Sequence, residues 1–211
     1  MKYLEDNLDM PIKDLLNIMQ NRCVYNTKYF GIPTIKSPID FWLYQEIIFQ
    51  TKPDIIVEIG TYYGGSTLGL AHIFDNMNQG CVIGIDIDHR KVALEVKEHP
   101  RIELITADAC EAFNEIKQRI SDHEKVLIIE DSSHEFENTL NILRTYSPLI
   151  SPGGYFIVED SICHHGLAVG PKPGPYEAIE QFVSEKNNFI IDRSREDFLI
   201  TWNPKGFLKH I

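Results

Sequence analysis

Acidic side chains recur at the ends of the predicted strands of this 211-residue chain. Successive runs rich in Val, Ile and Leu are each followed by a carboxylate, and the set comprises Glu58, Asp86, Asp108, Asp131 and the pair Glu159–Asp160. In open α/β sheets, ligands bind outside the carboxyl ends of the strands. Acids that only solvate the surface would scatter over helices and loops. The recurrence therefore predicts one ligand crevice lined with negative charge.

The first acid, Glu58, precedes a glycine-rich loop that reads "GTYYGGST". Glycines let a backbone approach a ligand closely, but the GxxxGG spacing from Gly60 does not match the dinucleotide fingerprint GxGxxG, and no Walker lysine follows. Glu58 would repel a pyrophosphate and would suit a cation. Asp86 ends the next predicted strand, where a ribose would offer its hydroxyls. A nucleoside that carries positive charge fits this pattern, and S-adenosylmethionine is such a molecule.

A second group of acids, Asp131, Glu159 and Asp160, follows two strands predicted to be neighbours. Two like charges about 4 Å apart repel by about 4 kcal/mol at an effective dielectric constant near 20. Three converging carboxylates therefore either protonate or recruit a cation, and oxygen ligands favour Mg²⁺ or Mn²⁺ over zinc. Singly, Asp131 or Asp160 is equally well explained as a turn or N-cap residue. A metal site explains the set better.

His134 follows Asp131 by three residues in "EDSSHEFE". A lone histidine beside a helix start is often a surface or capping residue. If Asp131 holds a metal ion, His134 lies within reach of the group that the ion polarises, which is where a general base belongs. Both interpretations stay open.

The elements that must position these residues alternate along the chain. From residue 53 onward, apolar runs alternate with helical stretches, and two closely spaced runs near the C-terminus, "NFIIDRS" and "DFLITWNP", have no helix between them. Nearly continuous apolar strands are typical of parallel sheets covered by helices on both faces. The pattern predicts an α/β domain over residues 53–211, Rossmann-like and doubly wound, with a mostly parallel sheet and an antiparallel edge strand.

Residues 1–52 are predicted to form an N-terminal helical extension. In "DMPIKDLLNIMQNR" the candidate N-cap is Asp9, and in "SPIDFWLYQEIIFQ" Ser37 caps, Pro38 takes the first position and Asp40 completes a capping-box-like start. The apolar stripes of both helices would pack on the main domain. They also offer a plausible contact for a homo-oligomer.

Composition excludes several classes of function. Lys and Arg number 20 against 31 Asp and Glu, so the net charge of −11 would repel a nucleic-acid backbone. Four widely spaced cysteines form no metal or disulfide pattern, which is typical of a reducing compartment. The acidic N-terminus lacks the apolar segment of a signal peptide, and no apolar run is long enough to span a membrane. We expect a cytoplasmic protein with no nucleic-acid or membrane partner.

Several of these motifs together resemble the cephalosporin hydroxylase family. The matching segments are "VEIGTYYGGSTLGLA", "GCVIGIDID", "DSSH", "YSPLISPGGYFIVEDS", "GPKPGPYEAIEQF" and "DRSREDFLITWNPKGFL". They cover nearly the whole chain, and their combination is more specific than the glycine loop alone. Despite its name, this family is similar to class I S-adenosylmethionine-dependent O-methyltransferases and resembles metal-dependent rhamnosyl and macrolide-sugar O-methyltransferases.

The resemblance implies roles for individual residues. The residues expected around the methionine part of the cofactor are Glu58, Gly60, Gly64 and Ser66. Asp86 would bind the ribose, while Asp108 and Ala109 would meet the adenine. The residues expected to bind Mg²⁺ are Asp131, Glu159 and Asp160, with His134 as the catalytic base. Two positions depart from the pattern: Ser133 stands where many relatives carry a second acid, and Glu130 where they carry an apolar residue.

We therefore expect an S-adenosylmethionine-dependent and Mg²⁺-dependent (or Mn²⁺-dependent) O-methyltransferase that acts on a hydroxyl of a small molecule, such as a sugar or a glycosylated secondary metabolite. One alternative is an iron-dependent hydroxylase, although its metal triad needs two histidines and one carboxylate. Another is a non-catalytic nucleotide-binding protein with this fold. The Gly/Pro-rich segment 163–175, with its two histidines, is either a loop that closes over the acceptor or an ordinary surface loop.

Overall fold

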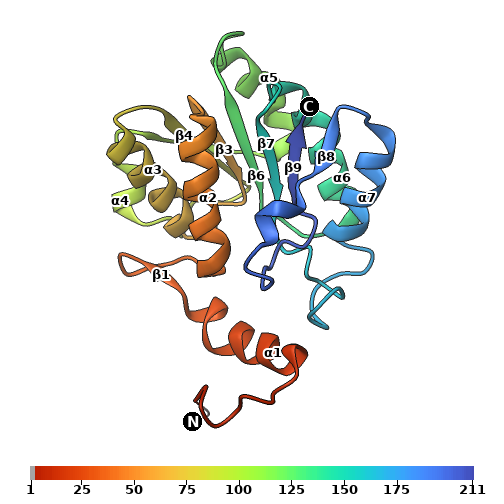
Figure 1. The fold of residues 1–211 in the computed structure, drawn as a ribbon. Helices are drawn as coiled ribbons and strands as arrows, with labels where there is room; N and C mark the ends of the chain where they lie inside the picture. The colour runs from red at the N-terminus through yellow and green to blue at the C-terminus, as the bar shows by residue number, and fades with distance from the viewer. Residues whose placement is uncertain (1–2) are drawn as a thin grey trace.

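Seven strands form the central sheet of the computed structural model, which describes residues 3–211 (Figure 1). In spatial order they are β5 (Ile102–Thr106), β4 (Cys81–Asp86), β3 (Ile55–Ile59), β6 (Val126–Glu130), β7 (Tyr155–Val158), β9 (Phe207–His210) and β8 (Phe189–Ile191). The first five are parallel, and β9 runs antiparallel to both β7 and β8. The prediction of a mostly parallel, Rossmann-like sheet with an antiparallel edge is confirmed.

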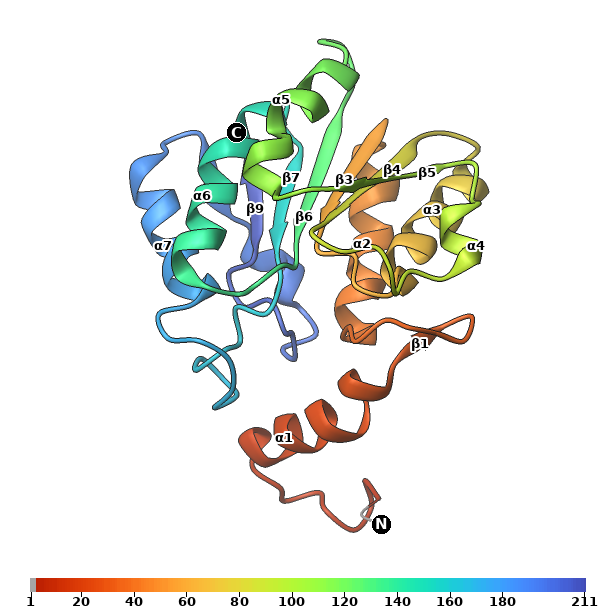
Figure 2. The same ribbon diagram turned by 180° about the vertical axis from the view of Figure 1, so that it is seen from behind.

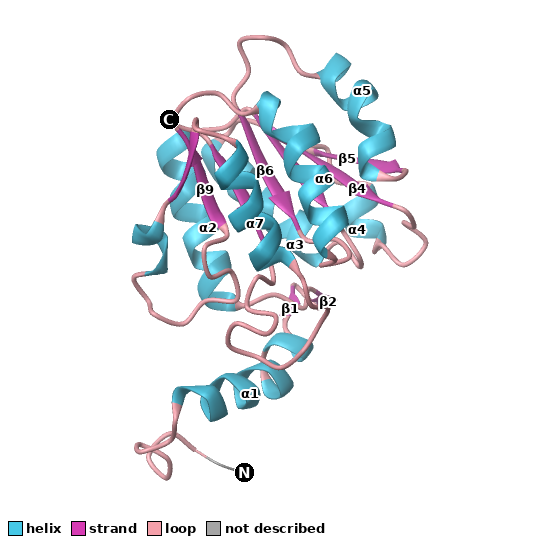
Figure 3. Ribbon diagram, turned by 90° about the vertical axis from the view of Figure 1, so that its right-hand side faces the viewer, coloured by secondary structure: helices cyan, strands magenta, loops and turns pink. Residues whose placement is uncertain are grey.

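Helices cover both faces of the sheet (Figures 2 and 3). One face packs against α2 (Pro38–Thr51) and α3 (Gly65–Met77), whose apolar side chains share a core with Ile56 and Ile129. The other face packs against α5 (Ala109–Arg119), α6 (Phe136–Tyr146) and α7 (Pro175–Glu185) around Val57 and Ile128. Because side chains alternate along a strand, Glu58 in β3 is directed to the same face as Ile56, toward α3.

The N-terminal part forms two helices and a short hairpin. Helix α1 (Ile12–Arg22) lies outside the sheet (Figure 1). Its Leu16 packs against Ile162 and Trp202. A hairpin of β1 (Lys28–Tyr29) and β2 (Ile32–Pro33) then leads into α2. Ser37 caps α2 as predicted, because its hydroxyl accepts the amide of Asp40. The first two residues of the predicted extension lie outside the described residues, and its boundary at residue 52 stays a prediction.

Three local predictions were wrong. Helix α1 starts at Ile12 after Pro11 with no side-chain cap, so Asp9 is not its N-cap. Between β4 and β5, where the alternation of apolar runs and helical stretches predicts a helix, α4 is only a single turn (Leu94–Lys97), and Val92 and Val96 are buried against Gly64 of the glycine loop. Asp40 does not complete a capping box; its buried carboxylate accepts hydrogen bonds from the C-terminal part of the chain.

The last strand also lies later than predicted. "DFLITWNP" forms a loop, and β9 begins at Phe207. The alternating pattern of this segment reflects tertiary contacts instead of a sheet: Trp202 is buried against α1, and Thr201 and Asn203 hydrogen-bond to Asp40 and Tyr44 of α2. Among the described residues, no helix is both long enough and apolar enough to cross a membrane.

Candidate functional site

A cavity of about 610 Å³ opens at the carboxyl ends of β3, β4 and β6. The predicted site residues that line it are Gly60, Asp86, Asp108, Ala109, Asp131, His134 and Asp160. The remaining predicted residues, which do not belong to this lining, are Glu58, Gly64, Ser66 and Glu159. Strand-end acids that follow four strands thus share one crevice, whereas Glu58 and Glu159, which the sequence pattern assigned to the same crevice, lie outside its lining.

Asp86 organises the glycine loop as well as lining the cavity. Its Oδ2 accepts the backbone N–H groups of Thr61 and Tyr62, each at 3.0 Å, and its Oδ1 accepts that of Asp88 at 3.2 Å. A carboxylate offers about four acceptor positions, so Oδ1 retains capacity for a ligand hydroxyl. The geometry is compatible with the predicted contact to a ribose.

Asp108 and Ala109 form the start of α5 at the cavity wall. Asp108 is the N-cap, and its Oδ1 accepts the N–H groups of Cys110 at 2.9 Å and Glu111 at 3.1 Å. The carbonyl of Ala109 accepts a 2.6 Å hydrogen bond from the hydroxyl of Tyr146 in α6. Both residues are therefore held rigidly, which suits recognition of a planar base.

The glycines of the loop serve contacts within the chain. Gly60 has φ +91°, and a Cβ there would overlap the carbonyl oxygen of Asp131 at the end of β6. Gly64, with φ +85°, would place a Cβ 2.9 Å from Val96. Only glycine adopts these conformations at no steric cost. The close approach that they permit is therefore first to the chain's own backbone and side chains.

Glu58 is buried beneath the cavity. Its Oε2 accepts a 2.5 Å hydrogen bond from Thr67 Oγ1, and Ser66 contributes a further hydrogen bond. Its Oε1 has no hydrogen-bond partner among the described residues. Burial raises the pKa of the Glu58 carboxyl, although the nearby Lys36 ammonium opposes the shift.

Lys36 is a site residue that the sequence analysis missed. Its side chain is buried, and Nζ donates to Asp131 Oδ2 at 2.6 Å and to Glu159 Oε1 at 2.5 Å. Glu58 Oε1 lies 3.9 Å away. Burial favours the neutral amine and lowers the pKa of Lys36, but the charges of the three acids outweigh this effect, so the pKa lies above its ordinary value. The only signal in the sequence was a lone lysine between two prolines, in "PTIKSP".

Asp131, His134 and Asp160 form a group whose ligand atoms all lie within 4.8 Å of one another. His134 Nε2 is 3.1 Å from Asp131 Oδ1 and 3.4 Å from Asp160 Oδ2. Burial opposes an imidazolium, but the hydrogen bond to Asp131 and the charge of Asp160 outweigh it and raise the pKa of His134 to about 9. Burial together with the charge of Asp131 raises the pKa of Asp160 to about 6, against the opposing effect of His134.

Glu159 contacts the group from the other side. Its carboxylate is paired with Lys36, and burial together with the charge of Asp131 raises its pKa well above the ordinary value. Asp131 thus joins the two halves, because Oδ2 faces Lys36 and Oδ1 faces His134. The structure brings Asp131 and Asp160 together with His134. Glu159 does not belong to this group, and it is connected to Asp131 through Lys36, which pairs with both carboxylates.

Glu130 and Ser133, the two residues that depart from the family pattern, lie in different surroundings. Glu130 is buried and turns away from the group; it accepts hydrogen bonds from Ser132, while Thr139 Oγ1 donates to it at 3.4 Å. Ser133 lines the cavity. In the Gly/Pro-rich loop, His165 stacks on Tyr176 and pairs with Glu177 at 2.9 Å, so it is directed at α7.

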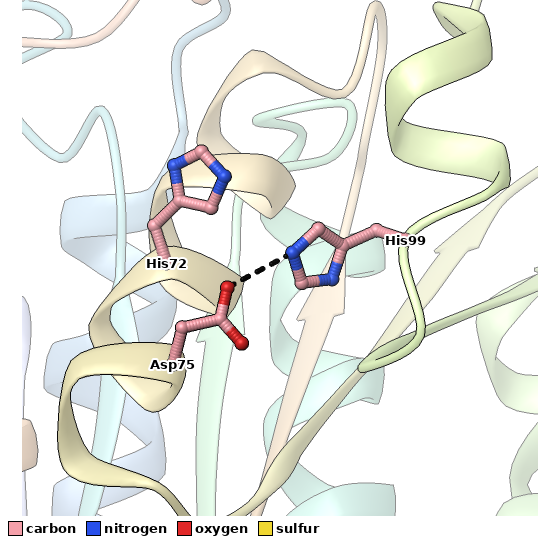
Figure 4. Close-up of side chains that lie close together, drawn as sticks. All are labelled: His72, Asp75 and His99. Carbon is pink, nitrogen blue, oxygen red and sulfur yellow. Dashed lines mark hydrogen bonds and ion pairs between the residues drawn. The ribbon is translucent and has the colours of Figure 1, made fainter.

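A group of two histidines and one carboxylate does occur elsewhere (Figure 4). It consists of His72 and Asp75 in α3 and His99 before β5, and none of them belongs to the cavity lining. The N–H of Arg101 donates to His99 Nδ1 at 3.2 Å, which leaves the proton on Nε2, 3.1 Å from Asp75. Arg101 also neutralises Asp75 at 2.7 Å. This arrangement is an ion-pair network, and it does not favour the iron-dependent hydroxylase.

Comparison with known proteins identifies a family that this chain matches. A family model described as Rhamnosyl O-methyltransferase/CmcI matches residues 21–211. The chain is 36% identical over 189 residues to the Rhamnosyl O-methyltransferase of Mycobacterium tuberculosis (strain ATCC 25618 / H37Rv), covering 86% of this chain and 77% of the relative. It is 32% identical over 193 residues to that of Mycobacterium leprae (strain TN), covering 88% and 84%.

Solved structures share the fold. A CmcI structure described with Mg and SAM superposes with a TM-score of 0.71 at 22% identity, over 89% of this chain and 77% of that one. The O-methyltransferase from Bacillus cereus, described in complex with SAH, gives a TM-score of 0.57 at 17% identity, over 89% and 86%. At these identities the likeness concerns the fold.

Proposed function

The chain belongs to the Rhamnosyl O-methyltransferase/CmcI family and is an S-adenosylmethionine-dependent O-methyltransferase, and we propose that it uses Mg²⁺ to methylate a hydroxyl of a sugar. The single observation that carries the proposal is the shared cavity. Asp86 and Asp108, suited to a nucleoside, line the same space as the Asp131–His134–Asp160 group. A cofactor and a cation can therefore meet in one crevice.

The cavity fits the cofactor in size and chemistry. Its volume of about 610 Å³ lies within the range of roughly 300–1,000 Å³ usual for small-molecule sites. Asp86 is placed for the ribose hydroxyls, and Ala109 with Ile142 provides apolar wall near Asp108 for the base. Glu58 lies outside the cavity lining, and in our proposal its carboxylate acts on the positively charged methionine part from there, through its charge and not through a contact.

The acid group fits a divalent cation. Four carboxylates, those of Glu58 and of the three predicted metal ligands, surround two cations, Lys36 and the His134 imidazolium. Their formal charges leave −2 with His134 protonated and −3 with His134 neutral, as the proposed base requires, so a divalent ion would offset most of the excess negative charge. Carboxylate oxygens are the ligands that Mg²⁺ and Mn²⁺ prefer. We propose Asp131, Glu159 and Asp160 as the residues that hold the ion.

When bound, S-adenosylmethionine would supply the methyl group and leave as the neutral thioether S-adenosylhomocysteine, and the divalent ion would supply a positive charge that favours ionisation of the acceptor hydroxyl. His134, at the cavity wall, accepts the hydroxyl proton in our proposal. His134 must be neutral to accept this proton. A divalent ion bound by Asp131 and Asp160 would offset the negative charges that raise the pKa of His134, and would therefore favour the neutral imidazole. The carboxylates of Asp86 and Asp108 hold the nucleoside in a fixed orientation, and positioning of this kind contributes up to ~7–11 kcal/mol.

A sugar acceptor is supported by the relatives, whose names specify a rhamnosyl group. The cavity wall formed by Thr34, Ile35 and Tyr62 combines hydroxyls with apolar surface. Such a lining suits the polar edge and apolar face of a pyranose ring.

Methyl transfer tests the proposal directly. The protein would be incubated with S-adenosylmethionine labelled in the methyl group and a panel of rhamnosides, other glycosides and catechols. We expect label in a glycoside, and we expect EDTA to abolish the transfer and added Mg²⁺ or Mn²⁺ to restore it. Undiminished transfer in EDTA would remove the metal from the proposal, and transfer to catechols alone would remove the sugar.

Two further properties are proposed. Trp42 and Phe49 lie seven residues apart on α2, and their side chains are 59% and 64% exposed. We infer that this apolar face of the N-terminal helices mediates a homo-oligomer, which light scattering of the wild type and of Trp42→Ser would test.

We also propose a cytoplasmic location, because the four cysteines are free thiols, which are typical of a reducing compartment.

A further inference from the structure

We propose that Lys36 is the built-in counter-ion of the metal site: its ammonium holds Asp131 and Glu159 together in the metal-free enzyme, and a divalent ion has to compete with it. This inference rests on the proposed Mg²⁺ dependence of the methyl transfer. It concerns a residue from the N-terminal part of the chain, outside the sheet that supplies the acids.

The contacts of Lys36 are those of a buried, fully paired cation. Nζ lies 2.6 Å from Asp131 Oδ2, 2.5 Å from Glu159 Oε1 and 3.9 Å from Glu58 Oε1, with the lysine side chain 4% exposed. A buried ammonium without partners would lose its proton or destabilise the fold. Here each partner is an acid from the end of a different strand, so Lys36 links β3, β6 and β7.

The backbone around Lys36 fixes it in this place. Its N–H donates to Thr27 Oγ1 at 3.0 Å, and the next residue, Ser37, caps α2. Thr34 and Pro33 lie against Gly65, where a Cβ would overlap them. The segment is therefore clamped between the hairpin, α2 and the first turn of α3, and the lysine side chain extends from it to the acids.

Asp131 is shared between two positive sites. Oδ2 is bound by Lys36, while Oδ1 faces His134 and belongs to the group with Asp160. A divalent ion that used both Asp131 and Glu159 would meet the ammonium at both carboxylates. Mutual repulsion between the cations weakens metal binding, whereas attraction to the same acids stabilises the metal-free protein.

Removal of the lysine charge should therefore have opposite effects on the two states. In Lys36→Met the metal-free site carries one more uncompensated negative charge, so we expect a lower melting temperature in EDTA than for the wild type. The same variant should bind Mg²⁺ at least about tenfold more tightly, because a nearby unit positive charge is gone. Its melting temperature should then rise with Mg²⁺ by more than that of the wild type.

The experiment measures Mg²⁺ affinity by calorimetry and melting temperature in EDTA and in Mg²⁺. The matched control is Lys205→Met, which removes a lysine paired with Glu180 at 2.6 Å, away from the cavity lining. We expect the control to keep the wild-type Mg²⁺ affinity. A lysine that only supported the fold would lower stability without tightening metal binding, so calorimetry separates the two roles.

Equal or weaker Mg²⁺ binding by Lys36→Met than by the wild type would overturn the counter-ion role. The proposed function would be unaffected by that result, provided that the wild type transfers methyl groups in the presence of Mg²⁺. If Lys36→Met does not fold even in Mg²⁺, the double variant Lys36→Met/Glu159→Gln decides, because it removes one charge of each sign. Recovery of the metal-free fold in the double variant would support the proposal. An unfolded double variant would overturn it.

Discussion

The Oγ1 hydroxyl of Thr201 donates a 2.5 Å hydrogen bond to Oδ1 of Asp40, although 161 positions separate the two residues. The backbone N–H of Trp202 donates to Oδ2 of the same carboxylate at 2.8 Å. Asp40 stands in the first turn of α2, four residues after Lys36. One buried acid therefore ties the segment that carries Lys36 to the C-terminal loop.

We expect Asp40→Ala to lower the free energy of unfolding by about 2–4 kcal/mol, because it leaves a buried hydroxyl and a buried amide without partners. Urea unfolding followed by circular dichroism measures the change. The exposed Asp197 offers a control, since Asp197→Ala should stay within about 0.5 kcal/mol of the wild type. A loss below 0.5 kcal/mol for Asp40→Ala would show that this link does not hold the two segments together.

Asp86→Asn is expected to weaken S-adenosylmethionine binding by about tenfold or more, because an amide keeps the size of the carboxylate but loses its charge-assisted hydrogen bonds. Calorimetry without acceptor measures this directly. Asp88→Asn, two residues further along, changes an acid that pairs with Arg90 and lies outside the main cavity lining, so it should leave the affinity unchanged. Equal affinities for the wild type and Asp86→Asn would remove Asp86 from the cofactor site.

His134→Ala is expected to reduce turnover by about 10²–10⁴-fold while cofactor binding is retained, since a positioned general base contributes that much. Single-turnover assays and cofactor calorimetry should be made on the same preparation. His165→Ala is the matched control, because its imidazole pairs with Glu177 in α7. Unchanged turnover in His134→Ala would end the base role.

The pKa of His134, raised to about 9, predicts a pH dependence of stability in EDTA. Between the unfolded value near 6.5 and about 9, the native protein holds one more proton than the unfolded chain. The contribution of His134 is therefore complete below pH 6.5 and is lost as the pH rises to 9, with a slope approaching about 1.4 kcal/mol per pH unit. The wild type and His134→Gln should converge over this window in urea unfolding. A difference that stays constant from pH 6 to pH 9 would contradict the shift.

Much of the site could be predicted because parallel strands share a direction. Acids that follow such strands must reach one edge of the sheet, so Asp86, Asp108 and Asp131 could be assigned to one crevice from their positions alone. The start of β9 could not be predicted, because the alternation in "DFLITWNP" serves burial of Trp202 against α1, a contact between opposite ends of the chain. Lys36 could not either, since its partners lie 95 and 123 positions away.

The predicted contact of Gly60 and Gly64 with the cofactor stays a prediction, and the structure adds contacts within the chain that the sequence did not reveal. A glycine in the sequence indicates that a close approach is possible at Gly60, but the atom that approaches it is set by the parallel pairing of β3 with β6. The excluding atom is the carbonyl oxygen of Asp131, and no spacing rule connects two positions so far apart.

That contact has a thermodynamic consequence. Gly60 lies against the Asp131 backbone, and the Asp131 N–H donates to the carbonyl of Ile59 at 2.8 Å, so the two turns cannot shift independently. In the proposed function, we therefore expect binding of the nucleoside beside Gly60 and binding of the cation at Asp131 to influence one another. Whatever factor Mg²⁺ applies to the cofactor dissociation constant, the cofactor must apply to that of Mg²⁺.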